Sequence, residues 1–291
     1  MNDLHRELAP ISSEGWSALD AEATRVLKAN LAARRLVDFH GPFGWTHAAV
    51  NVGRLQSLSS GPIQGVEASV RIVQPLIELR TSFELSRAEL DALGRGAADP
   101  DLEPLIAAAT RIAHAEDQVV FRGIGAGKVR GICEASPHVA LPISESYQEY
   151  PGTVAEATRV LRAAGVEGPY AIALGPRCYA GLMQATARGG WPVMELVHKL
   201  LDGPAIWAPA IDGAVVLGTR PGFFELTVGQ DLSIGYDSHD SERVRLYFLE
   251  SLTFRTLLPE AAVTLSYRSR VEPSARVERS PARRAPRRRT A

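Results

Sequence analysis

The feature that most constrains this 291-residue sequence is a pair of long alternating segments between Thr46 and Glu84. Apolar residues recur at every second position in the second segment, namely Val66, Ala68, Val70 and Ile72. This period-two pattern, with Gly61-Pro62 between the segments, predicts two antiparallel strands joined as a long ribbon. A two-stranded ribbon is not stable alone in water. The ribbon therefore needs a partner surface, which another subunit could supply.

Composition places the rest of the chain among globular proteins. Apolar residues make up 45% and charged residues 22%, which excludes wholesale disorder. No apolar run approaches the ~18 residues of a membrane span, and the acidic first residues do not resemble a signal peptide. Cys133 and Cys178 are too few and too far apart for a disulfide framework or a paired-cysteine metal site. We expect a soluble cytoplasmic protein without a cofactor or a metal.

Charge is unevenly distributed along the chain. Nine arginines and two glutamates lie between Arg268 and Ala291, so this tail has a net charge of +7. Because the whole chain has a net charge of −1, residues 1–267 have a net charge of −8. The tail contains three prolines and no apolar residue larger than valine, and we predict that it is disordered. Such an arm either binds polyanions, for example nucleic acid, or only keeps particles in solution. Both interpretations stay open.

Helix and strand signals divide the remaining sequence. Helical spacing of apolar residues predicts one helix from about residue 13 to 36 and a second long one over 101–121. Residues 134–219 alternate between helix and strand patterns, which indicates a compact α+β region. Residues 220–267 contain only strand patterns.

Three groups of residues are candidates for chemistry. Gly123–Lys128 is glycine-rich but lacks the first Gly and the Ser or Thr of a phosphate loop, so we interpret it as a turn. His114 and Asp117 share a helix face, but no second segment supplies metal ligands, and a structural ion pair is the preferred interpretation. Cys178 follows a predicted helix start, where the dipole could lower its pKa, but no histidine base can be placed beside it. We therefore predict no enzymatic activity.

Several long segments, spread in order from Leu4 to Tyr267, match a known family. They are LHRELAPISSEGWSALDAEA, LAARRLVDFHGPFGW, PLIELRTSFELSRAELDALGRG, AEDQVVFRG, VEGPYAIALGP, IWAPAIDGAVVLGTRPGFFELTVGQDLSIGY and VRLYFLESLTF. The sequence resembles an encapsulin shell protein of the linocin-like type. This resemblance implies an α+β fold of the Hong Kong 97 type, the phage major capsid fold with a P domain, an A domain and an extended E-loop.

The resemblance also divides the chain into domains. Its implied boundaries are 1–45 for the N-terminal helix and the start of the P domain, 46–84 for the E-loop, 85–133 for the P domain with its spine helix, 134–219 for the A domain, 220–267 for the P-domain strands and 268–291 for the tail, which typical members lack. The E-loop coincides with the predicted ribbon, which in such shells pairs with a neighbouring subunit. The resemblance also implies that the last strand, AAVTLSY at residues 261–267, ends the P-domain sheet.

By resemblance, the chain is the self-assembling shell of a T=1 icosahedral nanocompartment. It would enclose a cargo enzyme that carries a C-terminal targeting peptide, with a dye-decolourising peroxidase favoured and a ferritin-like iron protein second. These cargoes would link the shell to oxidative stress or to iron storage. The alternative is a phage or prophage capsid that packages DNA, which the charge of −8 on residues 1–267 disfavours. Some members bind flavin beside a Trp, but Arg87 stands at the matching position here, so we expect no flavin.

The resemblance finally assigns two sets of site residues. The predicted cargo-peptide site consists of Arg34, Leu36, Asp38, Asp231, Leu232, Ile234 and Tyr236. The alternative is that Leu36 and Ile234 are plain core residues. The predicted fivefold pore is lined by Ala187, Arg188, Gly189 and Gly190. A ring of Arg188 side chains would favour small anions, unless these side chains point to solvent beside the pore.

Overall fold

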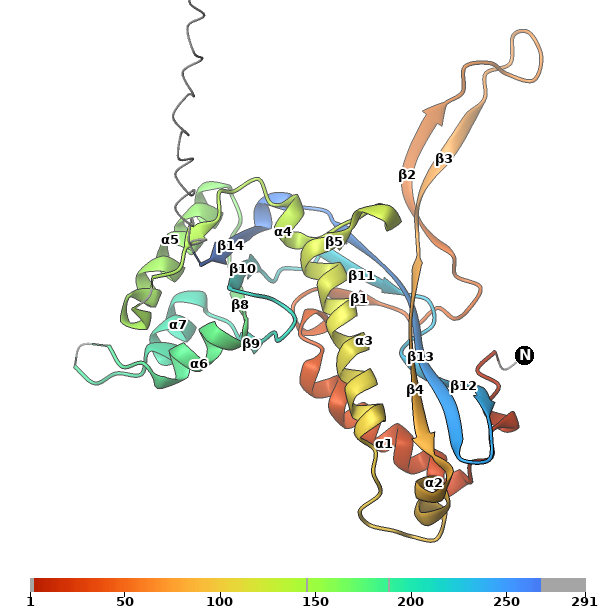
Figure 1. The fold of residues 1–291 in the computed structure, drawn as a ribbon. Helices are drawn as coiled ribbons and strands as arrows, with labels where there is room; N and C mark the ends of the chain where they lie inside the picture. Colours follow the sequence, from red (N-terminus) through yellow and green to blue (C-terminus); the bar gives the residue numbers. More distant parts are fainter. Residues whose placement is uncertain (1–2, 145, 188, 268–291) are drawn as a thin grey trace, which may run out of the picture.

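The structure is a computed structural model that describes residues 3–144, 146–187 and 189–267. Figure 1 shows three parts: a region around α5, α6 and α7, an elongated region built on α1, α3 and β13, and a projecting ribbon of β2 and β3. The Arg-rich tail, which we predict to be disordered, lies outside the described residues, as does Arg188. No helix in these three described ranges is long and apolar enough to cross a bilayer.

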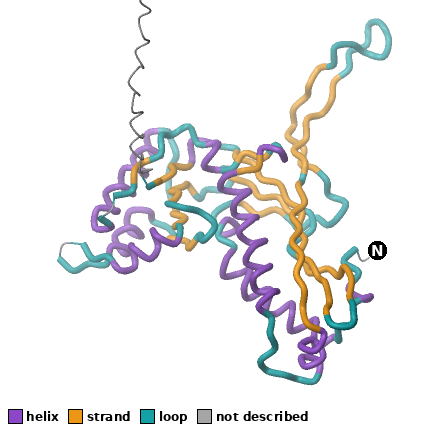
Figure 2. Tube along the Cα trace, viewed as in Figure 1, coloured by secondary structure: helices purple, strands orange, loops and turns teal. Residues whose placement is uncertain are grey.

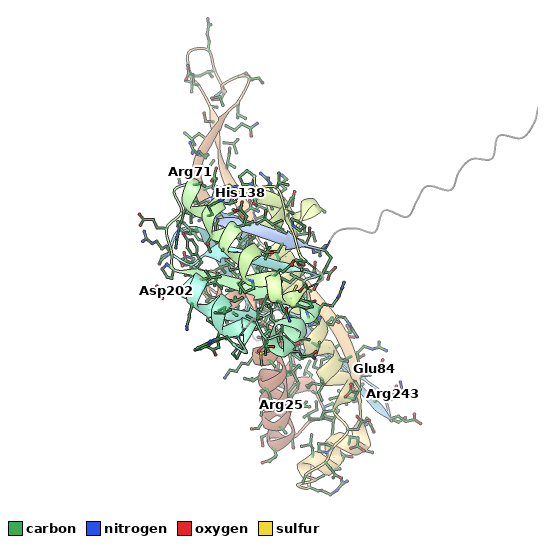
Figure 3. All side chains as sticks on the ribbon, turned by 90° about the vertical axis from the view of Figure 1, so that its left-hand side faces the viewer. Arg25, Arg71, Glu84, His138, Asp202 and Arg243 are labelled. Carbon is green, nitrogen blue, oxygen red and sulfur yellow. The ribbon has the colours of Figure 1, made fainter. Side chains whose placement is uncertain are left out.

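The elongated region is a five-stranded sheet covered on one face by helices. The strand order is β1 (Asp38–His40), β11 (Phe224–Val228), β13 (Arg243–Thr256) and β12 (Ser233–His239), with β4 (Ile77–Ser86) paired to the opposite edge of β13. Three helices accompany it: α1 (Ser13–Asn30), α2 (Arg87–Gly94) and α3 (Glu103–Arg122). Successive side chains of a strand point to opposite faces of the sheet. Phe83 and Phe248 therefore stack in the core, whereas Glu84 and Arg243 pair on the exposed face (Figure 3).

The N-terminal helix is shorter than its sequence pattern predicts. The Ser12 hydroxyl accepts the N–H of Gly15 at 3.0 Å and caps the helix, which ends at Asn30 rather than near residue 36. The chain then forms a short 3-10 turn, η2 (Ala33–Arg35), whose first N–H groups bond to Asp117 on α3. The Asp117 side chain, distant in the sequence, thus accepts hydrogen bonds that another turn of the helix would otherwise satisfy.

The second sheet contains the fold's clearest departure from expectation. Its order is β7 (Leu141–Pro142), β14 (Ala262–Ser266), β10 (Ala214–Gly218), β8 (Tyr170–Leu174) and β9 (Ala205–Trp207). The assignment of residues 262–267 to the sheet of β11, β12 and β13 is therefore wrong. Strand β14 is mostly buried and pairs with the fully buried β10, so the last strand completes the core of the α+β region instead.

Most remaining elements surround this second sheet or connect the two regions. They are α4 (Ile132–Ala135), α5 (Tyr150–Ala163), α6 (Pro176–Gln184), α7 (Val193–Leu201), η4 (Tyr147–Glu149) and η5 (Pro259–Ala261). The N-terminal turn η1 (Arg6–Leu8) lies beside β12 of the first sheet instead. The Gly123–Lys128 motif is a turn, as predicted: β5 (Gly123–Ile124) and β6 (Val129–Arg130) flank η3 (Gly125–Gly127). Gly123 has φ +80° and a Cβ there would lie 2.5 Å from the backbone N of Gly131, so only glycine fits.

Candidate assembly and peptide-binding surfaces

The ribbon is the most conspicuous unpartnered surface of the subunit. Strands β2 (Ala49–Ser57) and β3 (Ser69–Pro75) pair only with each other within the described ranges, and they project away from both sheets (Figures 1 and 2). The ribbon predicted from the alternating pattern is thus confirmed for residues 49–75. The rest of the predicted second strand is wrong as a ribbon strand, because residues 77–84 lie in β4 and pair with β13. The ribbon's apolar side chains are exposed to solvent in the single chain, namely Leu55, Leu58, Ile63, Val66, Val70, Ile72 and Val73.

These apolar side chains lie on both faces of the ribbon. The register pairs Val70 with Gln56 and Leu55 with Arg71. Because side chains alternate along a strand, Val70 and Ile72 share one face, while Leu55 and Val73 share the other. Their exposed fractions are between 40% and 66%. Each face therefore offers an apolar surface that gains stability when a second surface covers it.

The predicted cargo-peptide site is only partly assembled in the subunit. Arg34 and Asp231 are brought together, with Arg34 Nη2 2.8 Å from Asp231 Oδ1. Leu232, directly before β12, and Tyr236, on β12, are partly buried. These four residues lie in or beside the segment that begins β12.

The other three predicted residues do not join that set as surface anchors. Leu36 is 4% exposed and Ile234 is 3% exposed, and they belong to two separate hydrophobic cores. The structure therefore agrees with the alternative that these two side chains are core. Asp38 accepts the N–H of Gly222 at 2.6 Å and lines a separate hollow of about 130 Å³ beside Arg35.

Sequence reasoning missed two neighbours of this set. The first is the N-terminal segment, because Leu4 O accepts the N–H of Tyr236 at 2.8 Å and so covers part of the edge of β12. The second is a pair of buried acids, Glu116 and Glu250, which both contact Arg34. The signal for Glu250 was present in the sequence, since it is an acidic residue within the otherwise apolar run YFLESL.

The predicted pore loop is a tight turn between α6 and α7. Ala187 donates its N–H to Trp191 O at 2.8 Å, and Gly190 donates to Ala187 O at 3.0 Å. Gly189 and Gly190 both have positive φ, and the Trp191 side chain is exposed. Arg188 lies outside the described residues, and a single chain contains no symmetry axis. The pore stays a prediction.

The other chemical candidates have structural roles. Asp117 is buried, and this burial raises its pKa to about 7 while the carboxyl accepts N–H groups from η2. Burial raises the pKa of the Cys178 thiol, which is the opposite of the lowering that its place at a helix start suggested. The Arg87 guanidinium, at the position matching the flavin-binding Trp, donates to Asp240 O at 3.1 Å. Within the three described ranges, no group of three or more His, Cys, Asp or Glu could hold a metal ion.

Sequence comparisons relate the chain to shell proteins. A family model described as an encapsulating protein for peroxidase matches residues 1–253. A type 1 encapsulin shell protein of Rhodospirillum rubrum is 51% identical over 270 residues, which cover 91% of this chain and 96% of that protein. A type 1 encapsulin shell protein of Mycobacterium tuberculosis is 44% identical over 267 residues, which cover 92% and 100% of the two chains.

Structural comparisons relate the fold to capsids. A virus-like particle from Pyrococcus furiosus matches with a TM-score of 0.63 at 17% identity and covers 85% of this chain and 98% of that chain. The capsid protein of Myoviridae phage XM1 matches with a TM-score of 0.52 at 9% identity and covers 82% and 92%. At these identities the likeness concerns the fold alone. It confirms the predicted α+β fold of the phage major capsid type.

Proposed function

This chain belongs to the encapsulin family of shell proteins, and we propose that its copies close into a T=1 icosahedral compartment around a cargo enzyme. The chain itself is a structural protein and not an enzyme. We expect the shells in the cytoplasm. The division into P domain, E-loop and A domain, at the boundaries given above except for β14, is part of this proposal.

The observation that carries the assembly proposal is the two-faced apolar ribbon. An exposed ribbon with apolar side chains on both faces is unfavourable in a monomer, and burial between neighbouring copies would stabilise it. Free ribbon edges would also find hydrogen-bond partners on a neighbouring chain. We therefore place each ribbon between surfaces of adjacent subunits.

A charge on one face of the ribbon tests this arrangement. Val70 is 51% exposed, so Val70→Asp should leave the fold of the subunit intact while it places a carboxylate in the proposed interface. We expect negative-stain microscopy and light scattering to show complete shells for wild type and for Val70→Thr, the matched control. Val70→Asp should remain dispersed with unchanged circular dichroism. Complete shells formed by Val70→Asp would refute the ribbon's role.

The cargo is proposed from the family. The matching family model is described as an encapsulating protein for peroxidase, which supports a dye-decolourising peroxidase over a ferritin-like iron protein. Co-expression of the shell with each candidate, followed by mass spectrometry of purified particles, separates the two. Deletion of the last residues of the loaded enzyme should abolish loading if a C-terminal targeting peptide carries the signal.

We place the targeting peptide along Arg34, Asp231, Leu232 and Tyr236. These side chains combine charged and apolar groups beside a strand edge, which suits an extended peptide with a few apolar anchors. Leu36 and Ile234 support this surface from within the core rather than contact the peptide. The Arg188 pore and polyanion binding by the tail belong to the same proposal as further expectations.

A further inference from the structure

Three carboxyl groups converge on the guanidinium of Arg34, where η2, α3 and β13 meet. Arg34 Nη2 lies 2.7 Å from Glu116 Oε2 and 2.7 Å from Glu250 Oε1. The same nitrogen lies 2.8 Å from Asp231 Oδ1, and Arg34 Nε donates to Glu116 Oε1 at 2.9 Å. The side chains of Glu116 and Glu250 are fully buried, whereas that of Asp231 is 38% exposed.

The buried charges at this junction do not balance. Ionised Glu116 and Glu250 would carry two negative charges in a site without solvent, against the single positive charge of Arg34. No other cation in the described parts of the chain forms an ion pair with either glutamate. Asp231 adds negative charge from the solvent side, and the buried Asp117 adds more whenever it is ionised. An uncompensated buried carboxylate takes up a proton instead.

The position of the proton follows from the hydrogen bonds. Glu116 accepts from both Nε and Nη2 of Arg34, which is the geometry of a bidentate ion pair. Glu250 Oε2 is buried and has no hydrogen-bond partner among the described residues. Burial, together with the nearby Glu116, raises the pKa of Glu250 well above its ordinary value. Glu250 is therefore the member of the pair that keeps a proton.

We propose that a protonated Glu250, buried beside Glu116 and Arg34, is a pH-sensitive latch that holds η2 against α3 and β13 in each subunit. When Glu250 loses its proton, two carboxylates face each other inside the core and the junction is destabilised. The folded subunit binds this proton more tightly than the unfolded chain. Above the ordinary pKa of glutamate, each pH unit therefore lowers the folded-to-unfolded ratio by up to about tenfold, until the proton leaves the folded state.

The charge-neutral variant Glu250→Gln tests the latch. Purified full-length shells are melted from about pH 5 to about pH 9, and the thermal midpoint is followed by fluorescence. We expect the midpoint of wild type to fall more steeply with rising pH than that of Glu250→Gln. Glu84→Gln, which removes an exposed carboxylate that pairs with Arg243 and Arg245, is the matched control and should follow wild type. Parallel curves for wild type and Glu250→Gln would overturn the proposal.

A second measurement does not depend on the variant's folding. Infrared spectroscopy of wild-type shells that contain glutamate labelled with ¹³C at the side-chain carboxyl carbon should show the isotope-shifted C=O stretch of a protonated glutamic acid at neutral pH. Alkaline titration should remove this band at the same pH at which the thermal midpoint stops falling. The complete absence of a protonated glutamate band at neutral pH would overturn the proposal, even if Glu250→Gln failed to fold.

Discussion

The side chain of Asp117 accepts a hydrogen bond from the backbone N–H of Ala33 at 2.9 Å, across 84 residues of sequence. Its other oxygen accepts the N–H of Ala32 at 3.0 Å. These N–H groups follow the end of α1, so α3 supplies the acceptors that a further helical turn would otherwise provide. The contact ends the helix and directs Arg34 toward the buried glutamates.

Removal of the ionisable group at Asp117 should change the pH dependence of stability. Burial raises the pKa of Asp117 from 3.8 to about 7, so its proton stabilises the fold most below about pH 4, and this stabilisation is lost as the pH rises toward 7. The stability of wild type relative to Asp117→Asn should fall by up to about 1.4 kcal/mol per pH unit in this window. Urea unfolding of dissociated subunits at several pH values measures this difference in the free energy of unfolding. A difference between the two proteins that does not vary with pH would contradict a raised pKa for Asp117.

Charges placed at Leu232 and Ile234 should have different consequences. Ile234 is 3% exposed in the core of α1, α3 and the first sheet, so Ile234→Asp should prevent the subunit from folding. Leu232 is only partly buried at the proposed peptide site, so Leu232→Asp should form shells that load less cargo. Leu232→Met is the matched control with normal loading. Gel filtration followed by quantification of co-purified cargo distinguishes these outcomes. Normal cargo loading by Leu232→Asp would show that the targeting peptide does not bind at Leu232.

Local sequence patterns are sufficient to predict elements whose contacts lie between residues close in the sequence. The ribbon followed from period-two alternation, and the turn at Gly123 followed from glycine spacing. The sheet that contains β14 could not be read this way. The segment AAVTLSY has the pattern of a buried strand in any sheet, and its partner β10 is selected by the packing of the whole α+β region.

The candidate site was harder to predict because it depends on contacts between distant segments. Proximity of Arg34 and Asp231 was implied by the family resemblance, but local patterns did not distinguish Ile234 in the core from Leu232 near the surface. Both are apolar residues, two positions apart at the start of one short strand. The full burial of Ile234 depends on how α1 and α3 cover the sheet. The junction at Arg34 needs Glu250, from 216 residues away.

The thiol of Cys178 should be unreactive in the folded shell. It is buried 3.1 Å from the hydroxyl of Tyr267, and burial raises its pKa, so the thiolate that attacks reagents is scarce. We expect an aromatic disulfide reagent at neutral pH to label Cys178 in folded shells at least about tenfold more slowly than in the urea-unfolded chain. Mass spectrometry of a Cys133→Ala background isolates this site. Rapid labelling of the folded protein would show that the buried surroundings of Cys178 open to the reagent.

A chain that ends at Tyr267 should assemble as well as the full-length protein. Tyr267 bonds to the hydroxyl of Tyr147 at 3.0 Å and stacks under the guanidinium of Arg177 at 3.9 Å, so these two contacts survive this truncation. A chain that ends at Ser266 loses these contacts and should melt at a lower temperature. Negative-stain microscopy and thermal melting of the two truncations provide the comparison. Failure of the longer truncation to assemble would give residues 268–291 a structural role.

The same truncation tests whether the tail binds polyanions. The tail carries nine arginines against two glutamates, and we propose, from the resemblance to encapsulins, that the C-terminus lies on the outer surface of the shell. A single exposed tail binds weakly because salt screens its charges, but many tails on one particle act together. Full-length shells should therefore bind a heparin column at low salt and elute as the salt concentration rises, with a steep dependence on the logarithm of that concentration. Shells truncated after Tyr267 should pass through, because residues 1–267 carry a net charge of −8. If full-length shells also pass through at low salt, the arginines serve only to keep particles apart.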